Sequence, residues 1–319
     1  MRIADSMCTL MQPRTTAHTL RPAWFSATNA ADLAERGFTL VHDICTPADL
    51  AVLRTELPLL FARRAGSPEG KFYDMLGRDG SQRATLPTLL NPSQFAPALG
   101  RLECRVRTLQ IARWLLGDAV VLNLEHAILK PAQYGSPTPW HQDEAYRREP
   151  EFRYSQVSFW FPLDDCADES GCLRFVPGSN QGEVLQHRSF LNDAGTYALE
   201  CAEPIPFDRV EPLPVCAGDC SVHTGRTLHG AGPNLSLRPR FAYILEYEAP
   251  PVPLGERRQF AWHSNRRPPS RAIRARWLRR GGIFVEVFRR LKDGLFVPRR
   301  LRFEWRRSLR VLKNLFSGS

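Results

Sequence analysis

Several features that would place this chain in a familiar class are missing from its sequence. No run of about 18 or more uncharged apolar residues occurs among its 319 residues, so the sequence predicts no membrane-spanning helix. The first 25 residues carry three arginines but no continuous apolar stretch, so we expect no secretory signal and a cytoplasmic protein. With 43% hydrophobic and 24% charged residues, the composition is typical of a soluble globular protein.

Cysteine is present without the spacing of a disulfide framework or a zinc finger. The eight cysteines are scattered along the chain, and without an export signal we expect them to be reduced thiols. Cys216 and Cys220 lie close together, but no second Cys/His pair at zinc-finger spacing accompanies them. A structural zinc site is therefore not expected.

Positive charge is concentrated at one end of the chain. Residues 256–319 contain 19 Lys or Arg and only 4 Asp or Glu, whereas the rest contains 24 basic and 29 acidic residues. Apolar residues at helical spacing alternate with arginines over 273–291 and over 303–316, as in basic amphipathic helices. We divide the chain into an N-terminal arm (1–25), a main domain (26–255) and a basic amphipathic helical extension (256–319).

The predicted elements of the main domain are two helices followed by short strands. One helix is expected to begin at Thr46-Pro47 and a second to cover 101–116. The expected strands are Ala119–Lys130, Gln156–Leu163, Cys172–Val176, Asp219–Thr224 and Arg240–Glu248. Strands without intervening helices predict a mainly β (α+β) fold with a double-stranded β-helix (jelly-roll, cupin-like) core. Segments 65–97 and 181–217 are interpreted as long loops or lids.

A candidate metal site begins at Trp140-His141-Gln142-Asp143. Residues two apart on an extended chain point to the same face, so His141 and Asp143 are placed to bind one metal ion. The alternative is a surface turn in which Asp143 makes only local hydrogen bonds. His229, at the end of a strand-like stretch and before a Gly-rich turn, is a candidate third ligand, and His223 is its rival.

Arg240 follows His229 by eleven residues, at the start of an apolar strand. A guanidinium group in that position is expected to be partly buried, and a buried guanidinium requires an anionic partner. The sequence therefore predicts an anion near the candidate metal site.

In their order and gaps, these motifs resemble the phytanoyl-CoA dioxygenase family of iron/2-oxoglutarate oxygenases over about 110 residues, from Lys130 to Glu248. The elements that carry the resemblance are Trp140–Asp143, Ser158–Leu163 with Asp164-Asp165, Glu169–Leu173 leading to Pro177–Asn180, and Leu228–Asn234 followed by Arg240. The resemblance does not cover the chain after about residue 255.

The resemblance implies that His141, Asp143 and His229 hold Fe(II) and leave the remaining coordination positions to 2-oxoglutarate and O2. Arg240 is then expected to form a two-pronged pair with the distal carboxylate of 2-oxoglutarate. His229 is preferred to His223 because the Gly-rich turn and the interval to Arg240 follow it. The implied activity is a 2-oxoglutarate-dependent dioxygenase that hydroxylates an organic substrate. Related halogenases lack the carboxylate that Asp143 supplies, so hydroxylation is favoured over halogenation.

Five further residues near the motif are secondary candidates for the site. Lys130 and Gln142 match family positions close to the cosubstrate, and Trp160 is expected to line the pocket, although a buried strand tryptophan is more often part of the core. Tyr146 and Arg148, just after the His141/Asp143 pair, face either substrate or solvent.

The sequence carries little information about the substrate. The basic extension suggests peripheral association with the inner face of a membrane and a lipid-linked or amphiphilic substrate, such as a lipopolysaccharide sugar or acyl group. The alternatives are that the extension packs on the core, or that the chain is a soluble secondary-metabolite oxygenase. A nucleic-acid partner is not expected, because no nucleic-acid-binding module is recognisable. A non-catalytic jelly-roll binding protein and a zinc hydrolase with the same ligands are the rivals from other classes.

Overall fold

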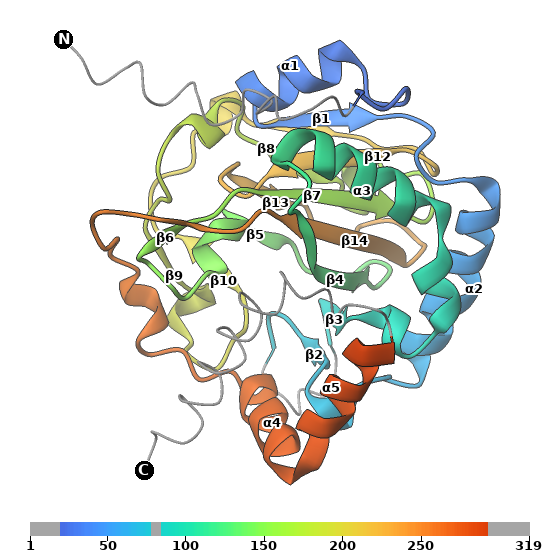
Figure 1. The fold of residues 1–319 in the computed structure, drawn as a ribbon, viewed down its shortest axis with the longest axis vertical. Helices are drawn as coiled ribbons and strands as arrows, with labels where there is room; N and C mark the ends of the chain where they lie inside the picture. Colours follow the sequence, from blue (N-terminus) through green and yellow to red (C-terminus); the bar gives the residue numbers. More distant parts are fainter. Residues whose placement is uncertain (1–19, 78–83, 293–319) are drawn as a thin grey trace.

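The computed structural model describes residues 20–77 and 84–292, and antiparallel strands form its centre (Figure 1). The major sheet has the strand order β1 (Phe38–Val41), β12 (Cys220–Thr224), β7 (Gln156–Pro162), β14 (Arg240–Glu248), β4 (Val121–Lys130), β3 (Pro87–Leu90) and β2 (Phe72–Asp74). The minor sheet has the order β11 (Glu211–Leu213), β8 (Leu173–Phe175), β13 (His229–Ala231) and β5 (Thr138–His141). Two short pairs, β9 (His187–Ser189) with β10 (Leu199–Cys201) and β6 (Phe152–Arg153) with β15 (Val252–Pro253), complete the strands. This is the mainly β architecture that the sequence predicts.

The residues of strand β7 show that the major sheet lies between two apolar cores. All of its residues are buried, as expected for a strand that is covered on both faces. Val157, Phe159 and Phe161 pack into the large apolar core beside the helices. Trp160, on the opposite face, belongs to the smaller core shared with the minor sheet. The inner face, between the two sheets, is therefore where side chains of both sheets meet.

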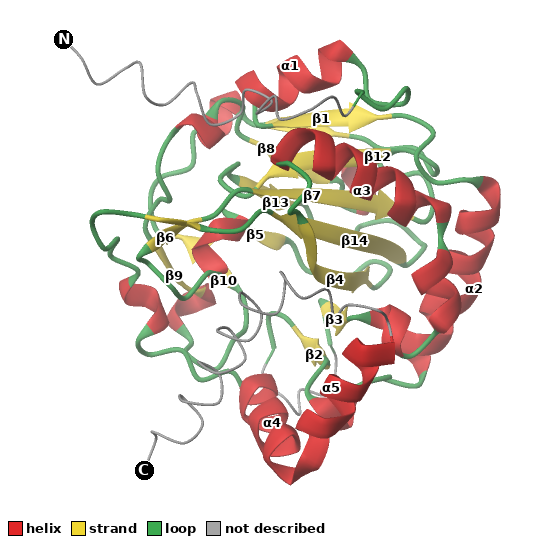
Figure 2. Ribbon diagram, in the orientation of Figure 1, coloured by secondary structure: helices red, strands yellow, loops and turns green. Residues whose placement is uncertain are grey.

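Helices α1 (Ala27–Glu35), α2 (Pro47–Ala62) and α3 (Glu103–Leu116) lie outside the strands (Figure 2). Helix α2 begins as predicted: Thr46 and Asp49 form a capping box, and Pro47 occupies the first turn. Leu53 and Leu57 of α2 are fully buried in the large core. The second predicted helix is observed as α3.

The strands predicted from alternation agree with β4, β7, β8, β12 and β14 to within a few residues. The interpretation of 65–97 and 181–217 as loops was wrong in part. Strands β2 and β3 pair with each other and extend the sheet beyond β4, with Leu89 opposite Ala127. Their three or four residues gain stability from the edge of β4, which is distant in sequence, so local composition does not reveal them. The segment 181–217 likewise contains β9, β10 and β11.

The basic extension is helical in its described part. Helices α4 (Pro269–Trp277) and α5 (Ile283–Lys292) are joined by a π-helical turn, Leu278–Gly282, and lie beside β2 and β3 (Figure 1). Glu286 of α5 ties the pair to the body through Lys71, at 2.7 Å. The second predicted amphipathic stretch, 303–316, lies outside the described residues. Within residues 20–77 and 84–292, no helix has the length and apolar character needed to cross a membrane.

Candidate active site

The inner face holds the three residues of the predicted metal site. His141 ends β5, His229 begins β13, and the two are direct partners in the register of these strands. The centroids of their imidazole rings lie 4.3 Å apart. Asp143 begins the 3-10 turn Asp143–Tyr146 that follows β5, and its Oδ1 lies 3.5 Å from Nε2 of His141 and 3.8 Å from Nε2 of His229. One ligand atom from each residue lies within 4.8 Å of the others.

Hydrogen bonds orient both imidazoles toward Asp143. Nδ1 of His141 lies 2.7 Å from the carbonyl oxygen of Pro139, and Nδ1 of His229 lies 2.9 Å from that of Thr227. A carbonyl accepts only from a protonated nitrogen, so these contacts place the proton on Nδ1 and leave the lone pair on Nε2. Both lone pairs therefore face the Asp143 carboxylate, which is how metal-binding histidines are usually held.

The charge states at this cluster suit a cation. Burial opposes the ionisation of Asp143, but His229, His141 and His223 together hold its pKa well below its usual range. Burial is also the main influence on His229, and with the neighbouring imidazoles it lowers the pKa of that ring well below its usual value. One carboxylate and neutral imidazole donors on one side of a site are the donor set of non-haem Fe(II). The residues therefore fit the metal.

His223, the rival candidate for the third ligand, contacts Asp143 on the side away from His141 and His229. It lies on β12, and its Nε2 is 3.3 Å from Oδ2 of Asp143, the oxygen that does not face His141 and His229. Ser158 of β7 donates to the same oxygen at 2.9 Å. His223 is not in the group of donors that converge on one point, so it and Ser158 orient the carboxylate.

Arg240 and Lys130 are register partners at one end of β14 and β4. Arg240 is only 7% exposed, and its Nε and Nη1 have no hydrogen-bond partner in the described structure. Its guanidinium carbon lies 5.3 Å from the ring of Trp160, which therefore forms a wall beside it. Burial lowers the pKa of Lys130 well below its usual value, and the nearby Arg240 lowers it further. The buried guanidinium of Arg240, which has no carboxylate partner in the described structure, therefore requires an anion.

The other predicted residues have more local contacts. Nζ of Lys130 donates to the carbonyl groups of Ala231 and Gly232. The buried amide of Gln142 accepts from the backbone of Leu185 at 2.7 Å and donates to that of Arg226 at 2.6 Å. These contacts of Gln142 tie the turn after β5 to the loops that precede β9 and β13.

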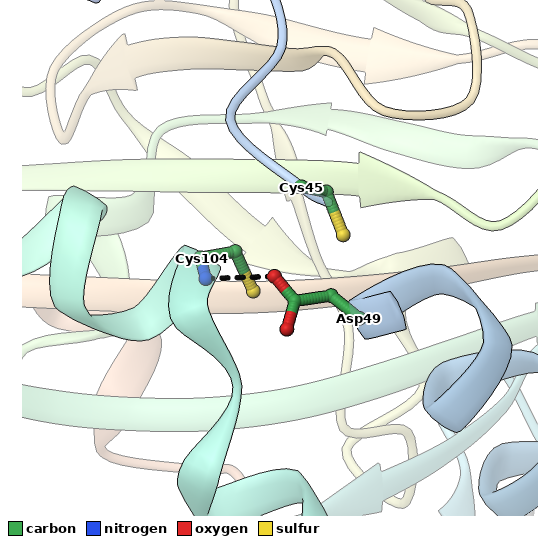
Figure 3. Close-up of side chains that lie close together, drawn as sticks. All are labelled: Cys45, Asp49 and Cys104. Carbon is green, nitrogen blue, oxygen red and sulfur yellow. Dashed lines mark hydrogen bonds between the residues drawn. The ribbon is translucent and has the colours of Figure 1, made fainter. Parts of the chain in front are cut away.

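A second group of possible metal donors lies between α2 and α3 (Figure 3). Cys45, Asp49 and Cys104 are all buried, but the carboxylate of Asp49 already accepts hydrogen bonds from the backbone N–H groups of Glu103 and Cys104, both at 2.9 Å. The N-cap residue of α3 is Leu102, whose apolar side chain cannot accept these hydrogen bonds. A hydrogen bond to Cys45 and burial raise the pKa of the Cys104 thiol, which disfavours the thiolate that a metal needs. We interpret this group as a helix cap.

An antiparallel double sheet that carries two histidines and a carboxylate on its inner face is the arrangement of non-haem iron oxygenases. A model of the Phytanoyl-CoA dioxygenase (PhyH) family matches residues 33–242. This chain therefore belongs to the phytanoyl-CoA dioxygenase family, as the motifs of the sequence predicted.

Individual relatives agree with this assignment. A probable alpha-ketoglutarate-dependent hypophosphite dioxygenase of Stutzerimonas stutzeri is 25% identical over 215 residues, which cover 66% of this chain and 74% of the relative. The crystal structure of EvdO2 from Micromonospora carbonacea var. aurantiaca is 35% identical with a TM-score of 0.66, and covers 74% of this chain and 96% of its own. The EvdO2 complex with 2-oxoglutarate is similar to this chain with a TM-score of 0.65.

The fold is shared more widely. EctD from S. alaskensis, solved with 2-oxoglutarate and 5-hydroxyectoine, is 21% identical with a TM-score of 0.59, and covers 83% of this chain and 92% of its own. Together these likenesses confirm the predicted jelly-roll fold. The family match, the hypophosphite dioxygenase relative and the EvdO2 complex also confirm a 2-oxoglutarate-dependent dioxygenase with iron, 2-oxoglutarate and O2 as its cofactor and cosubstrates.

Proposed function

We propose that this chain hydroxylates a small organic molecule, with His141, Asp143 and His229 as the iron ligands and Arg240 as the anchor of 2-oxoglutarate. The proposal is carried by two features of the same inner face. One is the convergent His/Asp/His donor set, and the other is the buried guanidinium of Arg240, which has no carboxylate partner in the described structure. When bound, iron, 2-oxoglutarate and O2 together supply an oxidant that puts one oxygen atom into a C–H bond and the other into succinate, with release of carbon dioxide.

The protein's own residues supply positioning and charge in this proposal. The Asp143 carboxylate would neutralise part of the metal charge, and together with the two neutral imidazoles it would confine the metal to one side of the site. The planar guanidinium of Arg240 matches the distal carboxylate of the cosubstrate with two parallel N–H donors, and Trp160 limits where that carboxylate lies. Lys130 lies beside Arg240 as its register partner, whereas the contacts of Gln142 favour a role in holding the turn that carries Asp143.

For the substrate, we propose a water-soluble metabolite, the secondary-metabolite alternative of the sequence analysis. The relatives named for hypophosphite and for ectoine support a small substrate. One observation favours the lipid-linked alternative: Phe284, Val287 and Phe288 of α5 are between 43% and 77% exposed and lie at helical spacing. That face is suited to the surface of a membrane, and with it a lipopolysaccharide sugar or acyl group would be the substrate class.

A flotation assay with anionic liposomes separates the two substrate classes. The full chain and a chain that ends near residue 265 are compared, together with a full chain carrying F284S and F288S. Flotation of the full chain alone supports the lipid-linked class, whereas equal and negligible flotation of all three supports the soluble one. A cytoplasmic location, and the division into an arm (1–25), a main domain (26–255) and an extension (256–319), belong to the same proposal.

Release of succinate tests the reaction itself. The purified chain with Fe(II), 2-oxoglutarate and air is expected to form succinate and carbon dioxide in equal amounts, and zinc in place of iron is expected to give none. A His229→Ala variant should lose this turnover, and a His42→Ala variant, which changes an exposed histidine, should keep it. Succinate formation that survives His229→Ala at the rate of the unchanged protein would disprove the assigned ligand set.

A further inference from the structure

Several largely buried arginines among the described residues have carboxylate partners. Arg147, for example, pairs with Glu246, and Arg258 with Glu144 at 2.7 Å. Such pairing is expected, because a buried guanidinium without an anion costs several kcal/mol. Arg240 is one exception, and the proposed function explains it through the cosubstrate. A second exception lies near the metal site and has no explanation in that function.

Arg266 is the centre of this second exception. It is only 2% exposed, and its Nε and Nη1 have no hydrogen-bond partner in the described structure. Its Nη2 donates to the backbone carbonyl of Tyr197. The guanidinium carbon lies 5.5 Å from the ring of Tyr146 and 5.7 Å from that of Tyr197. Aromatic faces stabilise a cation but do not accept its in-plane N–H groups.

Two more arginines lie around Arg266. The guanidinium carbon of Arg271 is 5.2 Å from the ring of Tyr197, and its Nη1 is buried without a hydrogen-bond partner. Arg148 is an exposed residue, and partial desolvation of its guanidinium, together with the positive charge of Arg271, lowers its pKa. In residues 20–77 and 84–292, no carboxylate lies within 4.0 Å of Arg148, Arg266 or Arg271. We call these three residues the arginine cluster.

The ring of Tyr146 lies between the arginine cluster and the proposed iron ligand His141. Tyr146 ends the 3-10 turn that Asp143 begins. Its ring meets that of His141 edge to face at 5.7 Å and also carries Arg266. Two more tyrosines pack next to Tyr146: the ring centroid of Tyr197 lies 6.2 Å from that of Tyr146 and 4.7 Å from that of Tyr73. The tyrosines therefore fix the arginines beside the site.

We infer that the arginine cluster binds the anionic group of the substrate, a phosphate, phosphonate or sulfate, and so holds the rest of the molecule toward the iron. This inference rests on the proposed function and specifies its substrate class. Three positive charges favour a doubly negative tetrahedral group over a single carboxylate. The anion approaches Arg148 and Arg271 from solvent, and Arg266 adds its charge from beneath.

The pKa of Arg266 agrees with this assignment. The pKa of Arg266 is lowered to about 10: burial is the main cause, Arg271 and Arg148 act in the same direction, and Tyr146 and Tyr197 act in the opposite one. An anion in the cluster removes this repulsion. If the arginines served only to fasten the extension to the tyrosines, they would stabilise the fold to the same degree with and without an anion.

Paramagnetic relaxation of phosphorus-31 tests the inference directly. The full chain is loaded with Mn(II) and 2-oxoglutarate, freed of excess metal, and titrated at constant ionic strength with glycerol 2-phosphate as the probe. We expect saturable relaxation enhancement, because the phosphate binds near the metal. Arg271→Gln and Arg148→Gln should each weaken binding about tenfold. Arg276→Gln, which removes an exposed charge from the same helix α4, should leave it within about twofold.

Each outcome separates this inference from the proposed function. Calorimetric binding of 2-oxoglutarate to the Mn(II)-loaded chain is measured first, and it should be the same in all three variants. Normal binding of 2-oxoglutarate without saturable phosphate binding, or equal phosphate binding by Arg271→Gln and Arg276→Gln, would overturn the inference alone. Failure of 2-oxoglutarate binding would overturn the proposed function. Sedimentation with phosphatidic acid vesicles in the absence of glycerol 2-phosphate binding would overturn the inference in favour of a lipid headgroup.

Discussion

Nε2 of His223 lies 3.3 Å from Oδ2 of Asp143, whereas the other oxygen of this carboxylate faces His141 and His229. His223 therefore touches the proposed ligand without joining the convergent donor set. Ser158 donates to the same oxygen at 2.9 Å. Such outer contacts fix the direction in which a carboxylate presents its free oxygen, so they contribute to metal affinity without a metal bond.

We expect His223→Ala to lower the affinity for Mn(II) by about 10- to 100-fold, and Ser158→Ala to lower it less, because a loosened carboxylate spends less time in the binding orientation. Competition with a fluorescent chelator measures both. His42→Ala, at an exposed histidine, is the matched control and should change nothing. If His223→Ala abolished binding as completely as His229→Ala, His223 would itself be a ligand.

Arg240→Lys tests the anchor of the cosubstrate while the positive charge is kept. Lysine provides one point of contact where the guanidinium provides two parallel donors, so the affinity for 2-oxoglutarate should fall at least about tenfold. Arg240→Gln should lose more, about 100-fold, because the charge is removed as well. Calorimetry with Mn(II)-loaded protein gives these affinities, and Mn(II) affinity itself should stay constant. An unchanged affinity in both variants would show that the cosubstrate lies elsewhere.

Sequence patterns located the central strands because those patterns reflect what packing requires. Strands β7 and β14 are rich in apolar residues and buried at nearly every position, since helices cover one face and the minor sheet the other. Strands β2 and β3, at one end of the major sheet, have no such signal, because each is short and the pair depends on β4, which is contributed by another part of the chain. Non-local pairing of this kind is what composition cannot show.

The proposed iron ligands were accessible from the sequence, since spacing and turn chemistry mark His141, Asp143 and His229. The arginine cluster was not. Arg148 was noticed for its position after the motif, but Arg266 and Arg271 belong to an extension whose arginines all look alike in the sequence. Only the folded chain distinguishes the buried Arg266 from the exposed Arg276, because the difference arises from Tyr146 and Tyr197, which are distant in sequence.

Asp49 provides a test of the helix-cap interpretation. Its carboxylate accepts the backbone N–H groups of Glu103 and Cys104, so Asp49→Ala should lower the free energy of unfolding by about 1–3 kcal/mol. Chemical denaturation measures this loss, with Glu35→Gln at an exposed position of α1 as the control. Dialysis of the unchanged protein against a chelator should leave the stability of this region unaltered. A loss of stability on chelation that Cys104→Ser removes would instead indicate a structural metal.

The last prediction concerns Glu286, which joins α5 to the body of the protein. Its carboxylate lies 2.7 Å from Nζ of Lys71, which is only 1% exposed, and 3.0 Å from the guanidinium of Arg274. Glu286→Gln leaves Lys71 without its anion, so we expect a loss of about 2 kcal/mol of stability, less than for a fully buried pair because Arg274 is partly exposed. Glu256→Gln, an exposed glutamate of the same extension, is the control in thermal unfolding.

The pH dependence of this loss has a definite sign. Burial opposes the ionisation of Glu286, but Lys71 and Arg274 outweigh it and lower its pKa below the ordinary value of 4.5. A lowered carboxyl pKa contributes stability that is complete above the pKa of the unfolded chain and is lost as the pH falls through that of the folded chain. The stability difference between the unchanged protein and Glu286→Gln should therefore be constant near neutral pH and shrink below about pH 4.5. A difference that persisted undiminished into strong acid would show that packing of α5, rather than this ion pair, holds the extension in place.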